Sequence, residues 1–154
     1  MASSDRQRRS RSRRLDDTRS GARERALTLL YEAETKGVTP SEVLSSLPLT
    51  PDDRVLELVH GVEGRREEAD AAIRDHARNW SIERMPVLDL AIMRLAYFEL
   101  IAEPATPTAV IIDEAVELAK RFSTDDSGRF VNGVLAAIAA GLSRGSADGP
   151  SQAE

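Results

Sequence analysis

The sequence contains no cysteine and few aromatic residues, with one Trp, two Tyr and three Phe among its 154 residues. The absence of cysteine excludes a disulfide framework and a thiolate metal site, and it fits a reducing compartment. With so few aromatic side chains, any core must be mainly aliphatic. The sequence also lacks an apolar run of about 18 residues that could span a membrane, and no apolar stretch follows its basic start as in a secretory signal. We therefore expect a cytoplasmic protein without a membrane segment.

The glycine-rich loops of common phosphate-binding enzymes are missing as well. There is no G-x-x-x-x-G-K-[ST] loop and no G-x-G-x-x-G loop. Only two histidines are present, His60 and His76, and Glu57 precedes His60 at the spacing of a carboxylate–histidine metal pair. Such a site needs a second pair and further glutamates from facing helices, so surface side chains are favoured. We predict no metal site and no cofactor.

Two pairs of neighbouring acids, Asp113-Glu114 and Asp125-Asp126, are the remaining candidates for catalysis. A shared proton would require two carboxylates that face each other, but neighbours on a helix point in different directions. Asp125 and Asp126 precede an expected helix, where acids complement the dipole and cap free N–H groups. We predict no catalytic site and hence a protein that is not an enzyme.

What the sequence has instead is a separation of charge. The stretch RQRRSRSRR, residues 6–14, carries six arginines, although the whole chain has a formal net charge of -5. Residues 1–25 contain nine arginines and four acids, a net charge of +5, so the remainder has a net charge of -10. A basic arm on an acidic body is typical of an arm that grips a polyanion. A solvated tail that only aids solubility has the same composition, and composition alone leaves both interpretations open.

The chain divides into an arm, a body and a tail. Residues 1–18 hold almost no apolar side chains, which predicts a disordered Arg-rich arm, and residues 143–154 are expected to form a second disordered tail. Between them we expect one helical domain, residues 19–142, with N-terminal helices over about 19–78 and C-terminal helices over about 81–142. Apolar residues recur at three- and four-residue spacings without an alternating strand pattern, so the fold class is all-α. The expected helices span about 20–36, 40–47, 51–78, 86–102, 108–122 and 127–142.

Local signals mark several boundaries and contacts of these helices. Thr39 and Glu42 have the spacing of a capping box, and Gly37 is placed to end the first helix. Further glycines lie inside expected helices, where each costs roughly 1 kcal/mol relative to alanine. They suggest close helix contacts at Gly61, Gly64 and Gly133.

Three segments of the body resemble a known family. AVIIDEAVELAKRFSTDDSGRFVNGVL, residues 109–135, strongly resembles the signature of the NusB family of bacterial transcription antitermination factors. RMPVLDLAIMRLAYFEL, residues 84–100, is similar to the central helix of that family, and ARERALTLLYEAE, residues 22–34, is similar to its first helix. The resemblance covers about 20–142 and implies an all-α fold of two packed three-helix bundles.

The resemblance also implies a function. Members of the family bind boxA, a single-stranded RNA element of ribosomal RNA leader transcripts, together with a small-subunit ribosomal protein that acts as NusE. The complex joins RNA polymerase and suppresses premature termination during rRNA transcription, and no enzymatic activity belongs to the family. Members occur as monomers and as homodimers, and this sequence does not decide between the two.

Several residues are carried over as candidates for RNA binding. The family has an arginine-rich motif at the start of its first helix, but this chain has Arg19-Ser20-Gly21 where three basic residues are common. We expect the arginines of 6–14 to supply the missing charge, since arginine grips phosphates and stacks on bases. The resemblance places the RNA-binding candidates at Arg19, Arg23, Arg25, Arg94, Asp126, Arg129 and Phe130.

Some of these assignments have alternatives. Phe130 could stack on a base or belong to the core, because its apolar spacing suits both. Asp126 could tune RNA affinity or cap the final helix, and Arg94 could be a solvated charge on a buried helix. By family position, Tyr31 and Asp89 lie on the face that binds the partner protein, although Tyr31 could equally be a half-buried ring.

Two other classes of protein compete with an antitermination factor. One is a free-standing helical accessory protein related to the NusB-like domain of RNA cytosine methyltransferases, and the other is a structural adaptor with a basic tail. The chain has no glycine-rich cofactor loop, which disfavours a methyltransferase. Its acidic body favours a basic ribosomal partner, since complementary fields speed encounter.

Overall fold

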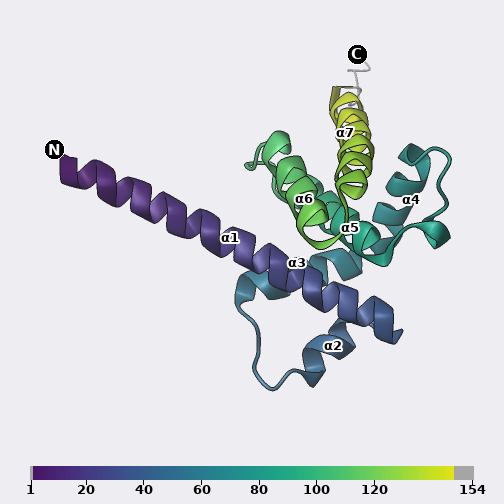
Figure 1. Cartoon of the computed structure of the whole chain (residues 1–154), viewed down its shortest axis with the longest axis horizontal. Coiled ribbons are helices and arrows are strands. Elements are labelled where there is room, and N and C mark those ends of the chain that lie inside the picture. Colours follow the sequence, from purple (N-terminus) through teal and green to yellow (C-terminus); the bar gives the residue numbers. More distant parts are fainter. Residues whose placement is uncertain (1, 148–154) are drawn as a thin grey trace, which may run out of the picture. The chain divides into compact units, whose positions relative to one another are not determined.

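The computed structural model describes the backbone of residues 2–147 and the side chains of residues 6, 7 and 18–143. Within residues 2–147 the chain forms α-helices and one 3-10 helix without any strand, which confirms the predicted all-α class (Figure 1). None of the described helices is long and apolar enough to cross a membrane. The elements are α1 (Ala2–Lys36), α2 (Pro40–Ser46), α3 (Asp53–Gly64), α4 (Arg66–His76), η1 (Ile82–Arg84), α5 (Val87–Ala102), α6 (Thr108–Phe122) and α7 (Asp125–Ala147).

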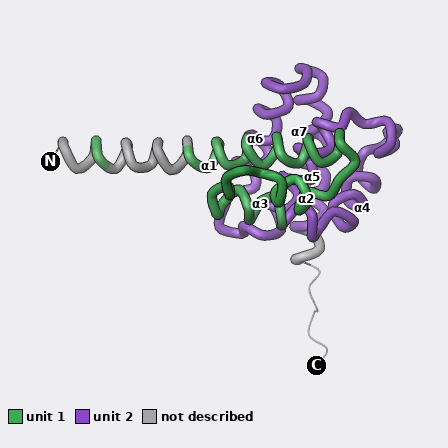
Figure 2. The backbone as a smooth tube through the Cα atoms, turned by 90° about the horizontal axis from the view of Figure 1, so that it is seen from below, with its two compact units in different colours: residues 1–60 green, residues 61–154 purple. Residues whose placement is uncertain are grey.

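The chain forms two compact units, residues 1–60 and 61–154, which divide within α3 (Figure 2). The division lies earlier than the boundary near residue 80 that the turns of the sequence suggested. α4 belongs to the second unit because it packs against α5 and α7. The first unit therefore contains α1, α2 and most of α3.

In the first unit α1 packs against α2. The predicted capping box of α2 is present: Thr39 Oγ1 accepts a hydrogen bond from the Glu42 N–H at 3.1 Å, and Glu42 Oε2 accepts one from the Thr39 N–H at 2.8 Å. Gly37 follows α1 with a φ of 67°, a left-handed conformation that favours glycine. The apolar spacing of residues 20–36 predicts one apolar face on α1. This face is buried throughout, at Ala22, Ala26, Leu29, Leu30 and Ala33.

The two terminal helices are longer than the sequence predicted. α1 begins at Ala2 rather than near Ser20. Residues 2–20 have little apolar surface to pack, but arginine has a high helix propensity and neither Gly nor Pro interrupts this segment. α7 ends at Ala147 rather than near residue 142, and the rest of the predicted tail, residues 148–154, lies outside the described residues. The disorder expected of the free arm stays a prediction.

The long helix predicted over 51–78 is broken in the structure at Arg65, between α3 and α4. Arg65 has a φ of -113° and a ψ of 16°, which depart from helical values. Gly64 precedes it and lowers the helix propensity at this point. The close contact predicted at Gly64 is wrong, and so is the one at Gly133, because no atom lies within 4 Å of an added Cβ at either glycine. At Gly61 the prediction is confirmed, since an added Cβ would lie 2.3 Å from the ring of Phe98.

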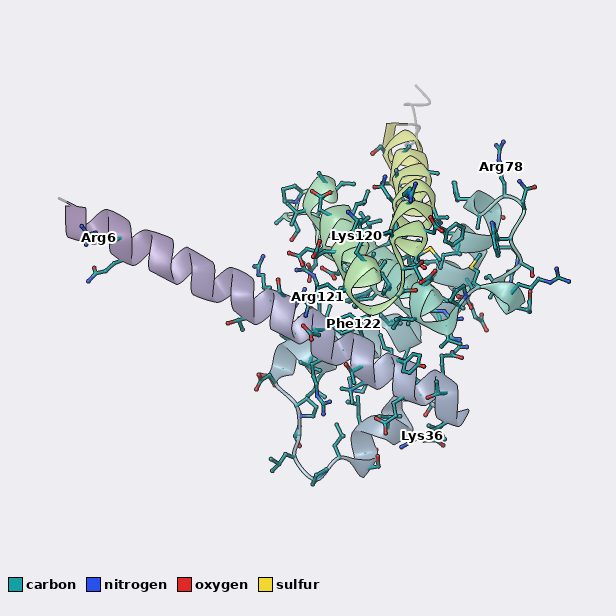
Figure 3. All side chains as sticks on the ribbon, viewed as in Figure 1. Arg6, Lys36, Arg78, Lys120, Arg121 and Phe122 are labelled. Atoms are coloured by element: carbon teal, nitrogen blue, oxygen red, sulfur yellow. The ribbon has the colours of Figure 1, made fainter. Side chains whose placement is uncertain are left out.

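The second unit is built around α5, which contacts α4, α6 and α7. Every residue from Asp89 to Glu99 is buried, which confirms the prediction of a central helix. α6 and α7 pack on each other, with Leu118 and Leu135 among their buried side chains. The apolar spacing of residues 108–122 predicts Phe122 on the inner face of α6. Phe122 is instead 44% exposed at the end of that helix, with the Arg121 guanidinium 5.0 Å from the centre of its ring (Figure 3).

Candidate nucleic-acid interface

The first candidate surface is the basic part of α1. Arg19 and Arg25 are exposed, so both can meet a polyanion. Arg23 is only 5% exposed and already takes part in an interaction within the chain. In the upstream arm, Arg6 is an exposed side chain on α1 (Figure 3), whereas the side chains of the arginines in 8–14 lie outside the described residues.

The second candidate surface is a pocket of about 300 Å³ in the second unit. It lies where η1, the start of α5 and the start of α7 meet, so that segments far apart in the sequence share it. Three of the predicted site residues, Asp89, Asp126 and Phe130, are brought together here. The pocket is lined by Trp80, Arg84, Met85, Pro86, Asp89, Thr124, Asp126, Ser127 and Phe130.

Two aromatic rings form one wall of the pocket. The ring centroids of Trp80 and Phe130 are 5.9 Å apart and their planes make an angle of 58°, a tilted arrangement that aromatic pairs favour. Trp80 is 55% exposed, while Phe130 is half-buried, so Phe130 is neither a core residue nor a free surface ring. Asn79, with a left-handed φ of 72°, turns the chain directly before Trp80. The sequence analysis missed Trp80 as a site residue, although a single Trp in a turn was a usable signal.

The start of α7 forms the rim of the pocket. Thr124 caps this helix, since its Oγ1 accepts a hydrogen bond from the Ser127 N–H at 3.0 Å. The cap expected from Asp125 or Asp126 is therefore wrong, and both acids lie in the first turn, where they complement the dipole. Asp126 Oδ1 accepts a hydrogen bond from Arg129 Nη2 at 3.2 Å, with side chains 93% and 79% exposed. Such an exposed pair contributes little stability and can exchange for contacts with a ligand.

Asp89 lies deeper than its expected place on a partner-binding face. It belongs to the first turn of α5, is only 2% exposed, and its Oδ1 is buried without a hydrogen-bond partner among the described residues. Tyr31, the other residue expected on that face, is 43% exposed on α1. Of the two, Tyr31 is therefore the one that offers a surface to a protein.

Arg94 does not line the pocket. It is 5% exposed, and its Nε and Nη2 donate hydrogen bonds to Asp70 Oδ1 and Oδ2 at 2.7 Å and 3.0 Å. The expectation of a solvated charge is wrong, because this bidentate pair links α5 to α4. A contact between Arg94 and RNA stays a prediction.

A second polar link joins the same two helices. The Tyr97 hydroxyl donates a hydrogen bond to Glu68 Oε2 at 2.7 Å. Burial, together with this bond, raises the pKa of Tyr97 to about 12. The same bond holds the pKa of Glu68 below its usual value, with help from Arg65. The Tyr97–Glu68 bond therefore also connects α5 to α4.

The histidines have no common site. His60 is exposed on α3, and Nδ1 of the half-buried His76 lies 2.8 Å from the carbonyl oxygen of Ala72 on α4. Among the residues whose positions are described, no group of three or more His, Cys, Asp or Glu side chains is placed to hold a metal ion.

The fold and the site define an all-α protein built for binding, with an exposed basic helix in one unit and an aromatic pocket in the other. The chain belongs to the NusB family, whose sequence model matches residues 20–140. Over 127 residues it is 45% identical to the transcription antitermination protein NusB of Saccharopolyspora erythraea, an alignment that covers 79% of this chain and 86% of the relative. Antitermination proteins of this family are not enzymes, and neither is this chain.

Two solved structures show the same fold. T. maritima NusB superimposes with a TM-score of 0.71 at 34% identity and covers 79% of this chain and 90% of its own. A crystal structure of the antitermination factors NusB and NusE in complex with dsRNA contains a chain that matches with a TM-score of 0.68 at 30% identity, covering 80% of this chain and 96% of that one. These relatives connect the fold with antitermination.

Proposed function

We propose that this protein is a cytoplasmic antitermination factor that binds boxA RNA of ribosomal RNA leader transcripts. It does so together with the small-subunit ribosomal protein that acts as NusE, joins the RNA polymerase antitermination complex and supports processive rRNA transcription. The observation that carries this proposal is the pocket lined by the Trp80–Phe130 pair and by Arg84. Arg129 pairs with Asp126, which lines the same pocket. The related structure that contains NusB, NusE and dsRNA supports the same assignment.

We assign the preference for the boxA sequence over other RNA sequences to the pocket. Trp80 and Phe130 offer ring surface to an unstacked base, and stacking of this kind contributes about 1–3 kcal/mol per base. The exposed guanidinium of Arg129 can leave Asp126 for a phosphate, and Arg84 adds a second positive charge beside the rings. Asp126 would then tune RNA affinity by competing for Arg129.

The arginines of α1 and of the arm provide affinity. Arg19 and Arg25 are exposed, and six further arginines precede them in residues 6–14. Contacts to phosphates position a strand but do not read its bases. We therefore assign the sequence-independent affinity for RNA to the arginines of the arm and of α1. We assign the preference for one base sequence to the pocket.

The ribosomal partner is expected to bind through the acidic body. Residues 26–154 carry a net charge of -10, which attracts a basic protein and speeds its encounter. Tyr31 is exposed on α1, and tyrosine is enriched at protein interfaces. We propose that Tyr31 contacts this partner.

A double substitution, Arg129→Ala with Phe130→Ala, tests the proposal. Because both side chains lie at the surface or rim, we expect the far-UV circular dichroism to keep its helical signal. The affinity for boxA, measured by fluorescence anisotropy, should fall to that for a scrambled strand. Arg121→Ala with Phe122→Ala removes another exposed Arg–Phe pair, which does not line the pocket, and should leave the preference intact.

Two results would count against the proposal. If the double variant of Arg129 and Phe130 still prefers boxA, the pocket does not read RNA. If that variant melts far below the wild type, Phe130 is a structural residue and the site is assigned wrongly. A structural adaptor would bind neither strand even as the intact chain.

A further inference from the structure

The first unit has a pocket of its own, of about 480 Å³, between the middle of α1 and the loop that connects α2 to α3. All of its lining residues belong to residues 1–60, so one compact unit forms it (Figure 2). It shares no residue with the pocket of the second unit. We call it the loop pocket, and its charges and apolar groups indicate what it can bind.

Gly21 keeps the wall that α1 provides open. The lining positions 18, 21, 22 and 25 recur at helical spacing, so they lie on one side of α1. An added Cβ at Gly21 would have nothing within 4 Å, so no protein atom fills the space beside this residue. A glycine inside a helix costs roughly 1 kcal/mol relative to alanine, and here it leaves room for a ligand.

Two arginines give the loop pocket its positive charge. Arg25 is exposed and forms no ion pair with another described side chain, so its guanidinium is available to a ligand. Arg54 lies with its Nη1 3.2 Å from Oε2 of Glu57, whose side chain is 58% exposed, and so weak a pair can exchange for contacts with a ligand. Asp52 is the only acid among the residues described as lining the loop pocket. An anionic group is therefore favoured, and the planar fork of arginine suits a carboxylate.

The α2–α3 loop adds an apolar side chain at the edge of the same pocket. Leu49 is 82% exposed, and no other large apolar side chain in the described part of the chain is more exposed. Pro48 and Pro51 flank it and restrict the backbone of the loop, so little conformational freedom is lost when Leu49 is covered. The loop pocket therefore offers aliphatic surface beside its two arginines.

This combination favours a protein segment over a nucleic acid. No aromatic ring is among the residues that line the loop pocket, so a base finds no ring on which to stack. Asp52 would repel a nearby phosphate, whereas it can accept a hydrogen bond from the N–H of a peptide. Leu49 gains most when another aliphatic side chain covers it, and a phosphate backbone offers none.

We infer that the loop pocket is a docking site for an acidic segment of a second protein, one that carries aspartate or glutamate beside leucine, isoleucine or valine. Its carboxylates pair with Arg25 and Arg54, and an aliphatic side chain covers Leu49. This partner is opposite in charge to the basic ribosomal protein of the proposed function. The inference does not depend on RNA binding.

The test uses the full chain and short peptides of random sequence displayed on phage. Peptides that bind the wild type but not Gly21→Gln are collected, because glutamine at this position fills the loop pocket with a neutral side chain. We expect these peptides to carry acidic residues next to aliphatic ones. One of them is then synthesised with a fluorescent label, and its affinity for each variant is measured by fluorescence anisotropy.

Arg54→Gln removes one of the two charges and should weaken binding of this peptide by about tenfold, as expected for a lost hydrogen bond between charged groups. Arg78→Gln is the matched control, because Arg78 is an exposed arginine that lines neither pocket, and it should leave the affinity unchanged (Figure 3). Gly21→Gln replaces a helical glycine by a better helix former without a clash, so its melting temperature should equal or exceed that of the wild type.

The outcomes separate the inference from the proposed function. If no selected peptide depends on Gly21, or if the dependent peptides lack acidic residues, the inference is wrong while RNA binding stands. If Gly21→Gln leaves peptide binding intact but weakens binding of a boxA strand, the loop pocket belongs to RNA and the inference is also wrong. A wild type that binds these peptides but no RNA would overturn the proposed function alone.

Discussion

Single charged residues of this protein show how strongly their surroundings decide their role. Arg94 matches a family pattern that suggested RNA binding, yet its guanidinium lies 2.7 Å from Asp70 and is buried on α5. Lys36 makes an ion pair with Glu32 at the end of α1, but there the lysine is 62% exposed. Both are pairs of one positive and one negative side chain. Breaking the buried Arg94–Asp70 pair should cost far more folding stability than breaking the exposed Lys36–Glu32 pair.

Replacing Arg94 tests its role as a link between α4 and α5. Arg94→Ala leaves Asp70 in a largely buried position without its partner, so we expect a loss of about 3 kcal/mol in the free energy of unfolding. Adding Asp70→Ala should restore part of this loss, because the unpaired charge is then removed. Urea denaturation measures both effects, and Lys36→Ala should change the stability by less than about 0.5 kcal/mol. A variant with an unchanged urea midpoint and a weakened RNA affinity would instead make Arg94 a ligand contact.

The site residues that the sequence could identify are those within the most specific segment of the family resemblance. Asp126, Arg129 and Phe130 follow one another closely at the start of α7, so a linear pattern contains them. Trp80 and Arg84 come from a turn and η1, and only folding brings them to the same pocket. The depth of Asp89 was equally out of reach, because sequence spacing does not tell whether a helix start faces solvent or a cavity.

At the scale of helices, one glycine decides how closely two of them pack. An added Cβ at Gly61 on α3 would lie 2.3 Å from the Phe98 ring of α5, which is itself buried. We expect Gly61→Ala to force this ring aside and to lower the free energy of unfolding by about 1–3 kcal/mol, despite the better helix propensity of alanine. Gly133→Ala is the matched control, since that glycine lies inside α7 with open space around it, and it should stabilise by up to about 1 kcal/mol. Thermal melting of both variants compares these effects, and an equally stable Gly61→Ala would show that Phe98 can move freely.

The helices themselves were largely predictable, because their apolar spacing and caps are local. The apolar face of α1, the capping box of α2 and the central position of α5 all follow from patterns that the sequence shows directly. The ends of α1 and α7 were not predictable, since a helix without packing partners is limited by propensity, which changes gradually along these segments. The break at Arg65 was missed because the apolar period continues from α3 into α4.

At the scale of the whole molecule, our proposal assigns general RNA affinity and sequence preference to different units. The first unit contains the arm and the exposed Arg19 and Arg25, and the second contains the pocket. For an RNA strand that contacts both units, arginine–phosphate contacts would contribute affinity without regard to sequence. The bases that enter the pocket would determine which sequence is preferred. The two contributions can therefore be removed separately.

Salt dependence measures the contribution of the arm. If about six arginines engage phosphates of a single strand, the logarithm of the affinity for boxA should fall against the logarithm of salt concentration with a slope near -4. Deleting residues 1–18 removes the six arginines of 6–14, and with only Arg19 and Arg25 exposed on α1 we expect a slope of about -1 to -2. The shortened chain should bind more weakly but keep its preference for boxA over a scrambled strand, because the pocket is intact.

Replacing the six arginines by lysines keeps the charge and should keep a slope near -4. A deletion that leaves the slope unchanged would show that the arm does not contact RNA, and one that abolishes the preference would show that the arm, rather than the pocket, reads the sequence.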